Sequence, residues 1–382
     1  MKIAILTTDN REQLKDYAAA APYFGTAPEA LVQGFAMLPE AEVHVVSCAR
    51  QPMQTPEKLA DNVWFHELLV PRNGWTRTAF LGCARAVRKK LREIRPAIVH
   101  GQGTERDCAI SAIRSGFPNV LTIHGNMRLI AKVTKAPLFS FPRLSAWLES
   151  YAVPRSQGVV CITRYTEEFI KPLNARTWVV PNAVDKNFFE VKICPPAGQP
   201  PRILCVGLIC VRKNQNAFIR ALDPLAQRHK FELVFLGKAT PGRAYEDEFL
   251  GLVAERPWCR HAGFTDREKL KQHFSGASLL ALPSLEDNCP MVILEAMATG
   301  LPVVGANVGG VPDLIEASQT GGFCDPLDAA SMSAAIERVL TNPAAAWQMA
   351  AEAKKQAQAR FHPRVIAARH LEIYREVLGK ES

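Results

Sequence analysis

A strand, a turn, a helix and a second strand follow one another directly between residues 279 and 313, in the sequence LLALPSLEDNCPMVILEAMATGLPVVGANVGGVPD. The apolar run at 279–283 is typical of a buried strand, and the polar turn after it opens a helix whose first position suits Pro290. Gly300 ends that helix, and the next strand starts at Pro302. Short apolar strands alternate with helical stretches along the rest of the chain as well. This pattern predicts an α/β fold built on parallel sheets.

Two acidic residues accompany the turn. Asp287 lies just before the predicted helix, and Glu295 lies eight residues further on, within it. The free N–H groups in the first turn of a helix favour phosphate, and a nearby carboxylate can accept hydrogen bonds from sugar hydroxyls. Together these groups suit a sugar joined to a phosphate. For an arbitrary pair of acids, a capped turn and a solvated helix residue would be the commoner explanation.

The sequence SLEDNCPMVILEAMATGLPVV, followed by a Gly-Gly pair, resembles the donor-site signature of family 4 glycosyltransferases, which are retaining enzymes of the GT-B fold. The resemblance implies two Rossmann-like, doubly wound parallel-sheet domains that face a cleft. It also implies that Asp287 binds hydroxyls of the transferred sugar and that Glu295 binds the ribose of the nucleotide. The helix between them would cover the donor diphosphate, with donor contacts from Asn288, Cys289, Pro290, Met291 and Val292.

The first half of the chain contains five predicted strands, at residues 2–7, 42–47, 97–100, 120–124 and 158–163. Ligands of open parallel sheets collect outside the carboxyl ends of the strands. The residues expected at that edge are Thr8, His100, Gly101, Gln102, Gly103, His124, Gly125, Asn126, Thr163 and Arg164. The run that starts at His100 lacks the third glycine of a dinucleotide fingerprint, so NAD is not expected as a cofactor.

His124 is the candidate catalytic residue of this edge. A lone histidine is more often a structural hydrogen-bonding group. The resemblance, however, implies that a histidine after this strand lies beside the donor sugar and helps to hold it. We expect Gln102, Asn126 and Thr26 on the acceptor side. Gly25, which stands where the family has an early Gly-Gly pair, is expected to let the backbone approach a donor phosphate or the acceptor, or else to form an ordinary glycine turn.

Lys213 is the candidate for stabilising charge on the leaving diphosphate, because it precedes a predicted helix and its ammonium can reach a bound diphosphate. Family members often carry an arginine directly after the glycine of the preceding strand, where this chain has Leu208. Arg212 either supplies this second cation or is a solvated neighbour. The strand ends expected to contact the nucleotide carry Gly207, Gly237 and Phe264.

Two domains are expected from the length of 382 residues, which exceeds the usual size of a single core. The sequence VVPNAVDKNFF resembles the family's hinge, and the proline-rich run at 195–201 suits a linker. We therefore place an acceptor-side domain at residues 1–185 and a donor-binding domain at residues 199–360. The resemblance also implies that the last helix, expected within residues 361–382, returns to the first domain.

The net charge of +9 is concentrated in two segments. Residues 85–95 carry apolar side chains at helical spacing, which predicts an amphipathic helix with a basic, solvated face. Residues 128–155 interleave aromatic and basic side chains, which suits either docking to an anionic membrane surface or a core-packed pair of helices. Nucleic acid is not expected as a partner, because no recognised binding motif accompanies the charge.

Ten cysteines are scattered without CxxC pairs, which indicates buried, reduced thiols and neither disulfides nor zinc. The apolar runs are too short for a signal peptide or a membrane span. The expected location is cytoplasmic, with the inner face of the membrane as a peripheral site. No DxD motif occurs, so neither a metal nor a cofactor is expected. Arg212, Lys213 and the helix N-terminus would stabilise the diphosphate instead.

The expected function is retaining transfer of a hexose from a nucleotide diphosphate sugar, with UDP ahead of GDP as the nucleotide. The acceptor is expected to be a glycan, a lipid-linked glycan or a small polar molecule in the assembly of polysaccharide or glycoconjugate. Three alternatives stay open: an epimerase or hydrolase of the same fold, a phosphorylase that uses pyridoxal phosphate, and a non-catalytic sensor of nucleotide sugars. The first would turn over without any acceptor, and the last would bind the donor without turnover.

Overall fold

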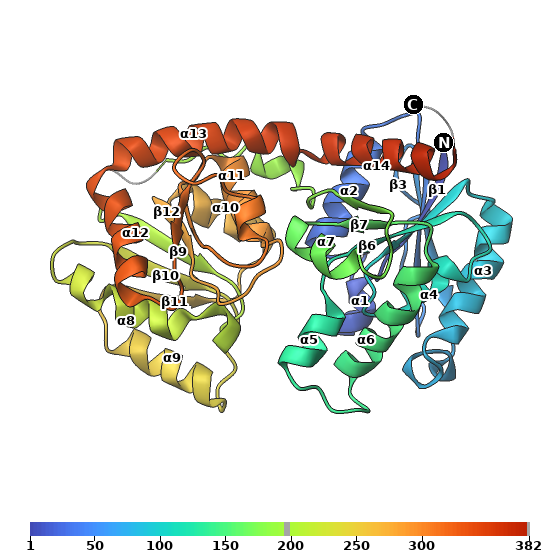
Figure 1. The fold of residues 1–382 in the computed structure, drawn as a ribbon, viewed down its shortest axis with the longest axis horizontal. Coiled ribbons are helices and arrows are strands. Elements are labelled where there is room, and N and C mark those ends of the chain that lie inside the picture. Colours follow the sequence, from blue (N-terminus) through green and yellow to red (C-terminus); the bar gives the residue numbers. More distant parts are fainter. Residues whose placement is uncertain (195–198, 380–382) are drawn as a thin grey trace. The chain divides into compact units, whose positions relative to one another are not determined.

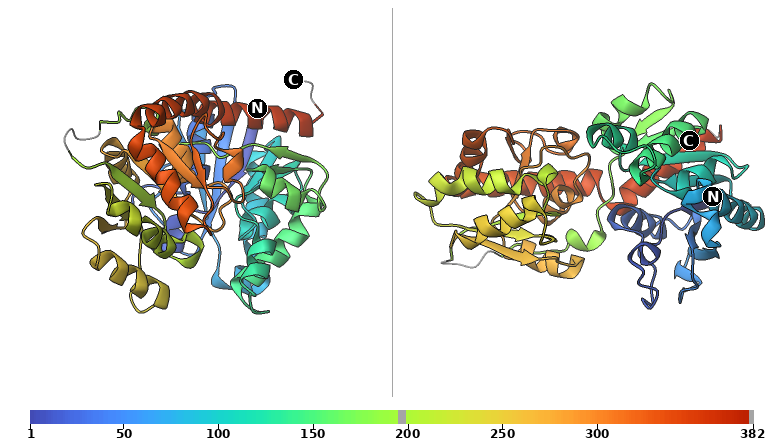
Figure 2. Two further views of the ribbon diagram at one scale, coloured as in Figure 1. Left: turned by 60° about the vertical axis from the view of Figure 1, so that its left-hand side comes forward. Right: turned by 90° about the horizontal axis from the view of Figure 1, so that it is seen from below.

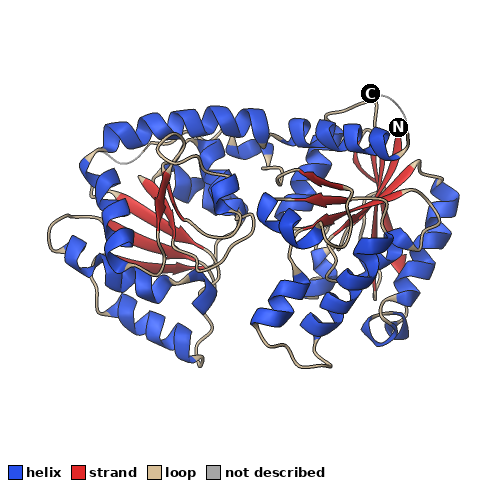
Figure 3. Ribbon diagram, viewed as in Figure 1, coloured by secondary structure: helices blue, strands red, loops and turns tan. Residues whose placement is uncertain are grey.

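The computed structural model describes residues 1–194 and 199–379. The chain divides into two compact units, Met1–Asp185 with His362–Ser382 and Lys186–Phe361. Each unit has its own largely parallel sheet with helices on both faces (Figures 1, 2 and 3). This arrangement confirms the predicted fold of two doubly wound α/β domains.

The sheet of the first unit has the strand order β3-β4-β2-β1-β5-β6-β7-β8. Its described strand pairs are parallel except for the antiparallel pair of β3 and β4. The strands are β1 (Lys2–Leu6), β2 (Glu42–Ala49), β3 (Lys58–Ala60), β4 (Val63–Leu69), β5 (Ile98–Gln102), β6 (Asn119–Ile123), β7 (Val159–Cys161) and β8 (Thr177–Val179). The sequence patterns predicted β1, β2, β5, β6 and β7. They missed β3 and β8, which have three residues each, and β4, whose sequence VWFHELL places charged groups among the apolar ones.

Helices cover both faces of this sheet. They are α1 (Asn10–Leu14), α2 (Thr26–Ala36), α3 (Leu81–Ile94), α4 (Asp107–Ile113), α5 (Met127–Val133), α6 (Phe141–Ala152), α7 (Arg164–Ile170) and α14 (Pro363–Val377), with the short 3-10 turns Arg72–Gly74, Thr76–Thr78 and Val153–Arg155. The helices α2 and α14 form one core with β1, β2 and β4, while α3, α4 and α6 form a second core on the opposite face. The predicted amphipathic helix at 85–95 is α3, and its buried side is that of Cys83, Val87, Leu91 and Ile94.

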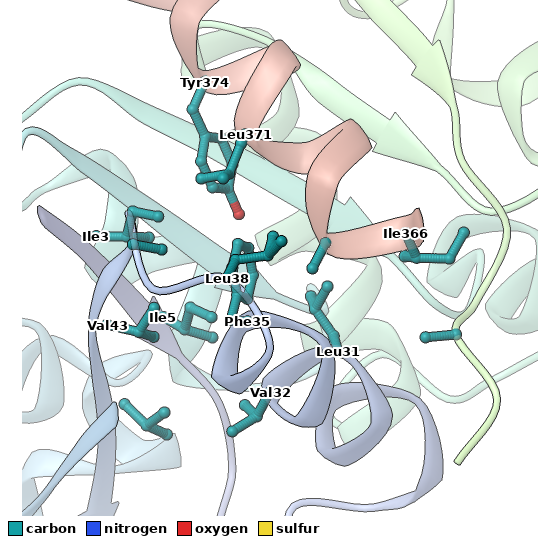
Figure 4. Packing of buried hydrophobic residues seen from close by; sticks show 14 of the residues in the cluster. Ile3, Ile5, Leu31, Val32, Phe35, Leu38, Val43, Ile366, Leu371 and Tyr374 are labelled. Carbon is teal, nitrogen blue, oxygen red and sulfur yellow. The ribbon is translucent and has the colours of Figure 1, made fainter. Parts of the chain in front are cut away.

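The last helix, α14, packs on α2 within the first unit, as the resemblance implied (Figure 4). Ile366, Leu371 and Tyr374 of α14 join the cluster formed by β1 and α2. A Cβ atom at Gly34 of α2 would lie 2.1 Å from the Pro363 carbonyl oxygen, so a side chain there would push the two helices apart. The helix begins at Pro363 and ends at Val377, and residues 380–382 of the predicted range lie outside the described residues.

The sheet of the second unit has the strand order β11-β10-β9-β12-β13-β14, and its described strand pairs are parallel. Its strands are β9 (Arg202–Val206), β10 (Glu232–Leu236), β11 (Cys259–Gly263), β12 (Leu279–Leu282), β13 (Val303–Ala306) and β14 (Gly322–Cys324). Its helices are α8 (Gln215–Ala226), α9 (Ala244–Ala254), α10 (Arg267–Ser275), α11 (Met291–Thr299), α12 (Ala329–Thr341) and α13 (Pro343–Arg360), with the 3-10 turns Lys186–Phe188, Val211–Lys213 and Val311–Asp313. Successive strands are added on one side of β9 up to β11 and on its other side from β12 onward. Open α/β sheets bind ligands at such a reversal of strand order, here between β9 and β12.

Two details differ from the sequence-based expectations. Pro290 precedes α11 in an extended conformation, so the helix begins one residue later than predicted. Residues 186–194, which lie between the two predicted domains, pack on the second unit. The Phe188 and Phe274 rings lie 6.0 Å apart, and the Cys194 N–H donates to the Ser275 carbonyl oxygen at 2.7 Å. Most of the proposed linker at 195–201 lies outside the described residues, because residues 195–198 are not described.

The described residues contain no disulfide, and six of the ten cysteines are buried. No helix among them is both long enough and apolar enough to cross a membrane.

Candidate functional site

The loops after β9 and β12 meet at the reversal point of the second sheet. The Leu285 N–H donates to the Arg212 carbonyl oxygen at 2.8 Å, which ties the two loops together. The turn Val211–Lys213 follows β9, and the polar turn before α11 follows β12. The fold therefore brings together two of the predicted site residues, Lys213 and Asp287.

Lys213 and Asp287 form a direct ion pair, with side chains 12% and 10% exposed. The Ser284 hydroxyl also donates to Asp287, at 3.0 Å. Arg212 lies on the outer side of the same carboxylate: one guanidinium nitrogen is 3.5 Å from Asp287 Oδ1 and donates to the Glu286 carbonyl oxygen at 3.1 Å. The two cations and the carboxylate thus share one small, half-enclosed volume, where charges interact more strongly than in open water.

Gly309 and Gly310 hold the backbone of Asp287. The Gly310 N–H donates to the Asp287 carbonyl oxygen at 3.0 Å. Gly309 has a φ of 55°, and a Cβ atom there would lie 2.1 Å from the same oxygen. The Gly-Gly pair of the sequence signature is therefore required by a close approach of two backbone segments.

Glu295 is buried within α11 and is paired with Arg267, at 3.1 Å from the guanidinium. This burial excludes the alternative of a solvated helix residue. Arg267 opens α10, and its guanidinium carbon lies 5.2 Å from the centre of the Phe188 ring. Sequence reasoning missed Arg267, because nothing in the local pattern indicates that α10 and α11 present these two side chains to each other.

The predicted glycines of the second unit lie at its strand ends. A Cβ atom at Gly237 would lie 1.9 Å from the Gly207 carbonyl oxygen, so these two loops require the absence of a side chain to come this close. The aliphatic stem of Lys213 passes 3.4 Å from the Cβ position of Gly207. Phe264 follows β11 and is 79% exposed, and Leu208 is 56% exposed. Of the predicted donor contacts around the start of α11, Pro290 is buried, while Asn288, Cys289, Met291 and Val292 are partly exposed.

In the first unit, His124 directly follows β6, and a hydrogen bond with a neighbouring strand holds its ring. Its Nε2–H donates to the Gln102 side-chain oxygen at 2.8 Å. Burial lowers the pKa of His124 to about 4. The ring is therefore neutral at physiological pH and can exchange hydrogen bonds with a sugar hydroxyl without carrying charge.

The hydrogen-bond network that holds the His124 ring extends to the last helix, α14. The Gln102 amide nitrogen lies 3.1 to 3.2 Å from the ring nitrogens of His100, which is completely buried. His100 in turn contacts the Thr122 hydroxyl at 2.7 Å and the Tyr374 hydroxyl of α14 at 2.5 Å. The network places Gln102 beneath the sheet edge, 6% exposed and bonded through both ends of its amide. Its predicted contact with the acceptor stays a prediction.

The other predicted residues of the first unit have local structural roles. Asn126 caps α5, because its side-chain oxygen accepts a hydrogen bond from the Leu129 N–H at 2.9 Å. Gly25 precedes α2 with a φ of 83°, and Thr26 is the first residue of that helix. The contacts proposed for these three residues with donor or acceptor stay predictions.

Glu105, which sequence reasoning missed, lies at the same edge as His124. Its carboxyl group fills the space above two glycines: Cβ positions at Gly103 and Gly125 lie 2.2 and 3.4 Å from its oxygens. Burial, opposed in part by backbone hydrogen bonds and reinforced by the charge of Glu149, raises the pKa of Glu105 to about 7. The fully buried Glu149 accepts the Met127 and Arg128 N–H groups at the start of α5, at 3.0 and 3.2 Å.

One cluster among the described residues has the composition of a metal site. The ligand atoms of Cys48, Cys83 and Asp107 lie within 4.8 Å of one another in the interior of the first unit. A hydrogen bond with Cys83 and burial raise the pKa of the Cys48 thiol, and burial raises the pKa of Asp107. Because metals bind the deprotonated groups, this environment disfavours the ligand forms.

Comparisons with known families cover both units. Residues 30–188 match the family described as Glycosyltransferase Family 4, and residues 200–342 match the family described as Glycosyl transferases group 1. The chain is 28% identical over 232 residues to a glycogen synthase of Mycobacterium tuberculosis, an alignment that covers 59% of this chain and 56% of that protein. It is 25% identical over 324 residues to the alpha-D-kanosaminyltransferase of Streptomyces kanamyceticus, covering 79% and 83%. The chain thus spans about half the length of several of its curated relatives and most of the length of others.

Solved structures show the same fold. The sucrose-phosphate synthase of Thermosynechococcus elongatus superposes with a TM-score of 0.78 at 20% identity, over 99% of each chain. The Anabaena protein HepE, solved in complex with UDP and glucose, superposes with a TM-score of 0.70 at 17% identity, over 98% of this chain and 99% of that one. The chain belongs to the family 4 glycosyltransferases and has their GT-B fold.

Proposed function

We propose that this protein is a retaining glycosyltransferase that moves a hexose from a UDP-sugar to an acceptor hydroxyl. The observation that carries the proposal is the Lys213–Asp287 pair at the reversal point of the second sheet, next to the start of α11 and with the buried Glu295 eight residues on. A diphosphate needs cations and free N–H groups, whereas sugar and ribose hydroxyls need carboxylates. All these groups belong to the second unit.

In the proposed reaction, the bond between the anomeric carbon and the diphosphate oxygen breaks, and the acceptor oxygen bonds to the same face of that carbon. The acceptor proton passes to the departing phosphate, so no covalent protein nucleophile is required. Lys213 offsets the charge that develops on the diphosphate, together with the N–H groups at the start of α11. Asp287 holds hydroxyls of the sugar, and Glu295, oriented by Arg267, holds those of the ribose.

Arg212 takes the role of the family arginine that Leu208 replaces. Its guanidinium already reaches the Asp287 carboxylate, whereas Leu208 offers no charge. Transfer proceeds without a metal ion, because Arg212 and Lys213 supply the positive charge that a metal would otherwise bring. The role proposed for His124 is that of a neutral hydrogen-bonding group for the sugar, because burial lowers the pKa of its ring to about 4.

The nucleotide is proposed to be UDP, with GDP as the second choice. HepE was solved with UDP-glucose, and a trehalose-6-phosphate protein of E. coli with UDP-2-fluoro glucose. The exposed ring of Phe264 offers a face on which the base can stack. The acceptor is proposed to belong to glycan or lipid-linked glycan assembly. One relative, 31% identical over 163 residues, is the O-antigen chain mannosyltransferase B of E. coli. Peripheral contact with an anionic membrane fits the exposed Leu138 and Phe139 among basic neighbours.

The first test is thermal stability against UDP-, GDP- and ADP-sugars, with EDTA and then with Mg²⁺. A ligand at about a hundred times its dissociation constant should stabilise the folded state by roughly 2.7 kcal/mol. We expect a shift with one nucleotide class, unchanged by EDTA. Release of free sugar or isomerised donor without acceptor would instead support the hydrolase or epimerase, and binding without turnover under any acceptor would support the sensor.

A further inference from the structure

A cavity with a volume of about 1160 Å³ lies in the first unit, lined mainly by residues of α5, α6 and α7. Pockets for small molecules usually measure about 300–1,000 Å³. The cavity is therefore larger than a single sugar needs. Its lining includes Leu138, Phe139, Phe141 and Trp147 together with Arg128 and Lys132.

Several large apolar side chains around this cavity lie outside the hydrophobic core. Among the residues whose burial is described, fifteen large hydrophobic ones are exposed, and six of these lie within 130–147, where Phe139 is fully exposed. The helices α5 and α6 and the loop between them pack on one another through Met127, Ala131, Ala136 and Ala146. Leu148 and Tyr151 of α6 pack on the second core, so the core-packed alternative holds for that side of the helix. Phe139, Phe141 and Trp147 are exposed instead.

The charge around the cavity is strongly positive. Arg128 and Lys132 lie four residues apart on α5, so their like charges share one helix face. Arg77 and Arg143 also line the cavity. Among the lining residues that are described, Glu168 is the acidic one. None of the four cations forms an ion pair with an acidic side chain in the part of the chain that is described. An anionic group would relieve the repulsion along α5.

The lining of the cavity includes a residue of the loop that follows β6. Asn126, which lines it, is two residues from His124 and caps the helix that carries both cations of α5. Glu149 fixes the start of that helix through the Met127 and Arg128 N–H groups. An occupant with its apolar part against Leu138 and Trp147 would have its anionic part within reach of Arg128 and Lys132, on the helix that Asn126 caps.

We propose that this groove binds the apolar chain of a single phosphate-bearing lipid, with the phosphate at Arg128 and Lys132, and that this lipid carries the acceptor sugar. The proposal rests on the proposed transferase function, because it assigns the class of its acceptor. It is distinct from docking on a bilayer, in which a protein rests on many lipids and no single chain enters a groove.

The test is equilibrium binding of farnesyl phosphate to the full chain, below the concentration at which this lipid aggregates. Tryptophan emission provides the signal, because Trp147 lines the cavity and is 53% exposed. We expect saturable binding with one site per chain. Farnesol, which lacks the phosphate, and inorganic phosphate, which lacks the chain, should each bind at least tenfold more weakly. The emission change should disappear in Trp147→Phe.

Two pairs of variants separate the groove from the general surface. Leu138→Ser should weaken binding at least tenfold, whereas Leu327→Ser, a similarly exposed leucine of the second unit, should leave it unchanged. Lys132→Glu should weaken binding in the same way, and the exposed Lys230→Glu of the second unit should not.

Equal effects within either pair would overturn the proposal, because binding would then be non-specific. Sedimentation with phosphatidylglycerol vesicles without binding of monomeric farnesyl phosphate would also overturn it and would establish bilayer docking. The donor-induced thermal shift, measured on the same samples, keeps the two proposals apart. Binding of farnesyl phosphate without binding of any nucleotide sugar would contradict the transferase proposal and support the lipid site. Binding of a nucleotide sugar without binding of farnesyl phosphate would support the transferase proposal and contradict the lipid site.

Discussion

The hydroxyl of Tyr374 lies 2.5 Å from a ring nitrogen of His100, although 274 residues separate them in the chain. Through Gln102 this contact leads to His124 at the edge of the sheet. The last helix therefore contributes to the support of a candidate active-site residue as well as to the core of the first unit.

Tyr374→Phe tests that support. The change removes the hydroxyl and leaves a fully buried ring nitrogen of His100 without this partner, which should lower the free energy of unfolding by about 1–3 kcal/mol. Denaturant titration measures it as a lower midpoint at unchanged slope. Tyr151→Phe is the control, because the Tyr151 hydroxyl lies at the surface near Arg114, at 3.2 Å, and should cost little. Equal costs for the two variants would show that the buried contact contributes nothing.

Lys213→Ala should lower kcat for sugar transfer by about 100-fold or more, because it removes a cation aimed at the developing charge of the leaving diphosphate. Arg212→Ala, which removes a cation 52% exposed, should lower it less. Steady-state rates with saturating donor measure both effects. Unchanged transfer by Lys213→Ala would contradict the assignment of this site.

Gly309→Ala should weaken donor binding and lower the melting temperature. Its Cβ would lie 2.1 Å from the Asp287 carbonyl oxygen, and the residue adopts a positive φ, so the cost should be on the order of 1–3 kcal/mol. Gly251→Ala is the matched control. It lies in α9 with open space around its Cβ position and should stabilise the protein by about 0.5–1 kcal/mol. A neutral Gly309→Ala would show that the Asp287 loop adapts freely.

The stability of the protein should depend on pH through Glu105. Its pKa is raised to about 7 in the folded state, so the folded protein holds this proton at pH values where the unfolded chain has lost it. The contribution is complete below about pH 4.5 and is lost as the pH rises to about 7, with a size on the order of 1–3 kcal/mol. Glu105→Gln, which resembles the protonated acid, should flatten this part of the curve. Parallel curves for the two proteins between pH 4.5 and 7 would contradict the shifted pKa.

The sequence patterns alone predicted an α/β fold built on parallel sheets, and the family resemblance added the two-domain GT-B architecture and the predicted donor site. The predicted strands are apolar runs with clear ends. Such a run identifies a buried parallel strand even when the neighbouring strands are unknown. The resemblance supplied the predicted roles of Asp287 and Glu295, whereas the positions of Asp287, Glu295 and Lys213 in a turn, in a helix and before a helix followed from strong local signals. The short β3 and β8 and the mixed β4 were missed because their pairing partners, and not their own residues, make them strands.

Only the tertiary structure decided which groups meet. Arg267 pairs with Glu295, Glu105 fills the space above two glycines, and Tyr374 reaches His100. None of these contacts leaves a periodicity in the sequence, because the partners belong to different elements. The exposure of Phe139, in the loop before α6, and of Trp147 on α6 was equally undetermined, since their sequence suits either burial or exposure. The structure buries Leu148 of α6 and leaves Phe139 and Trp147 in the lining of an apolar, basic cavity.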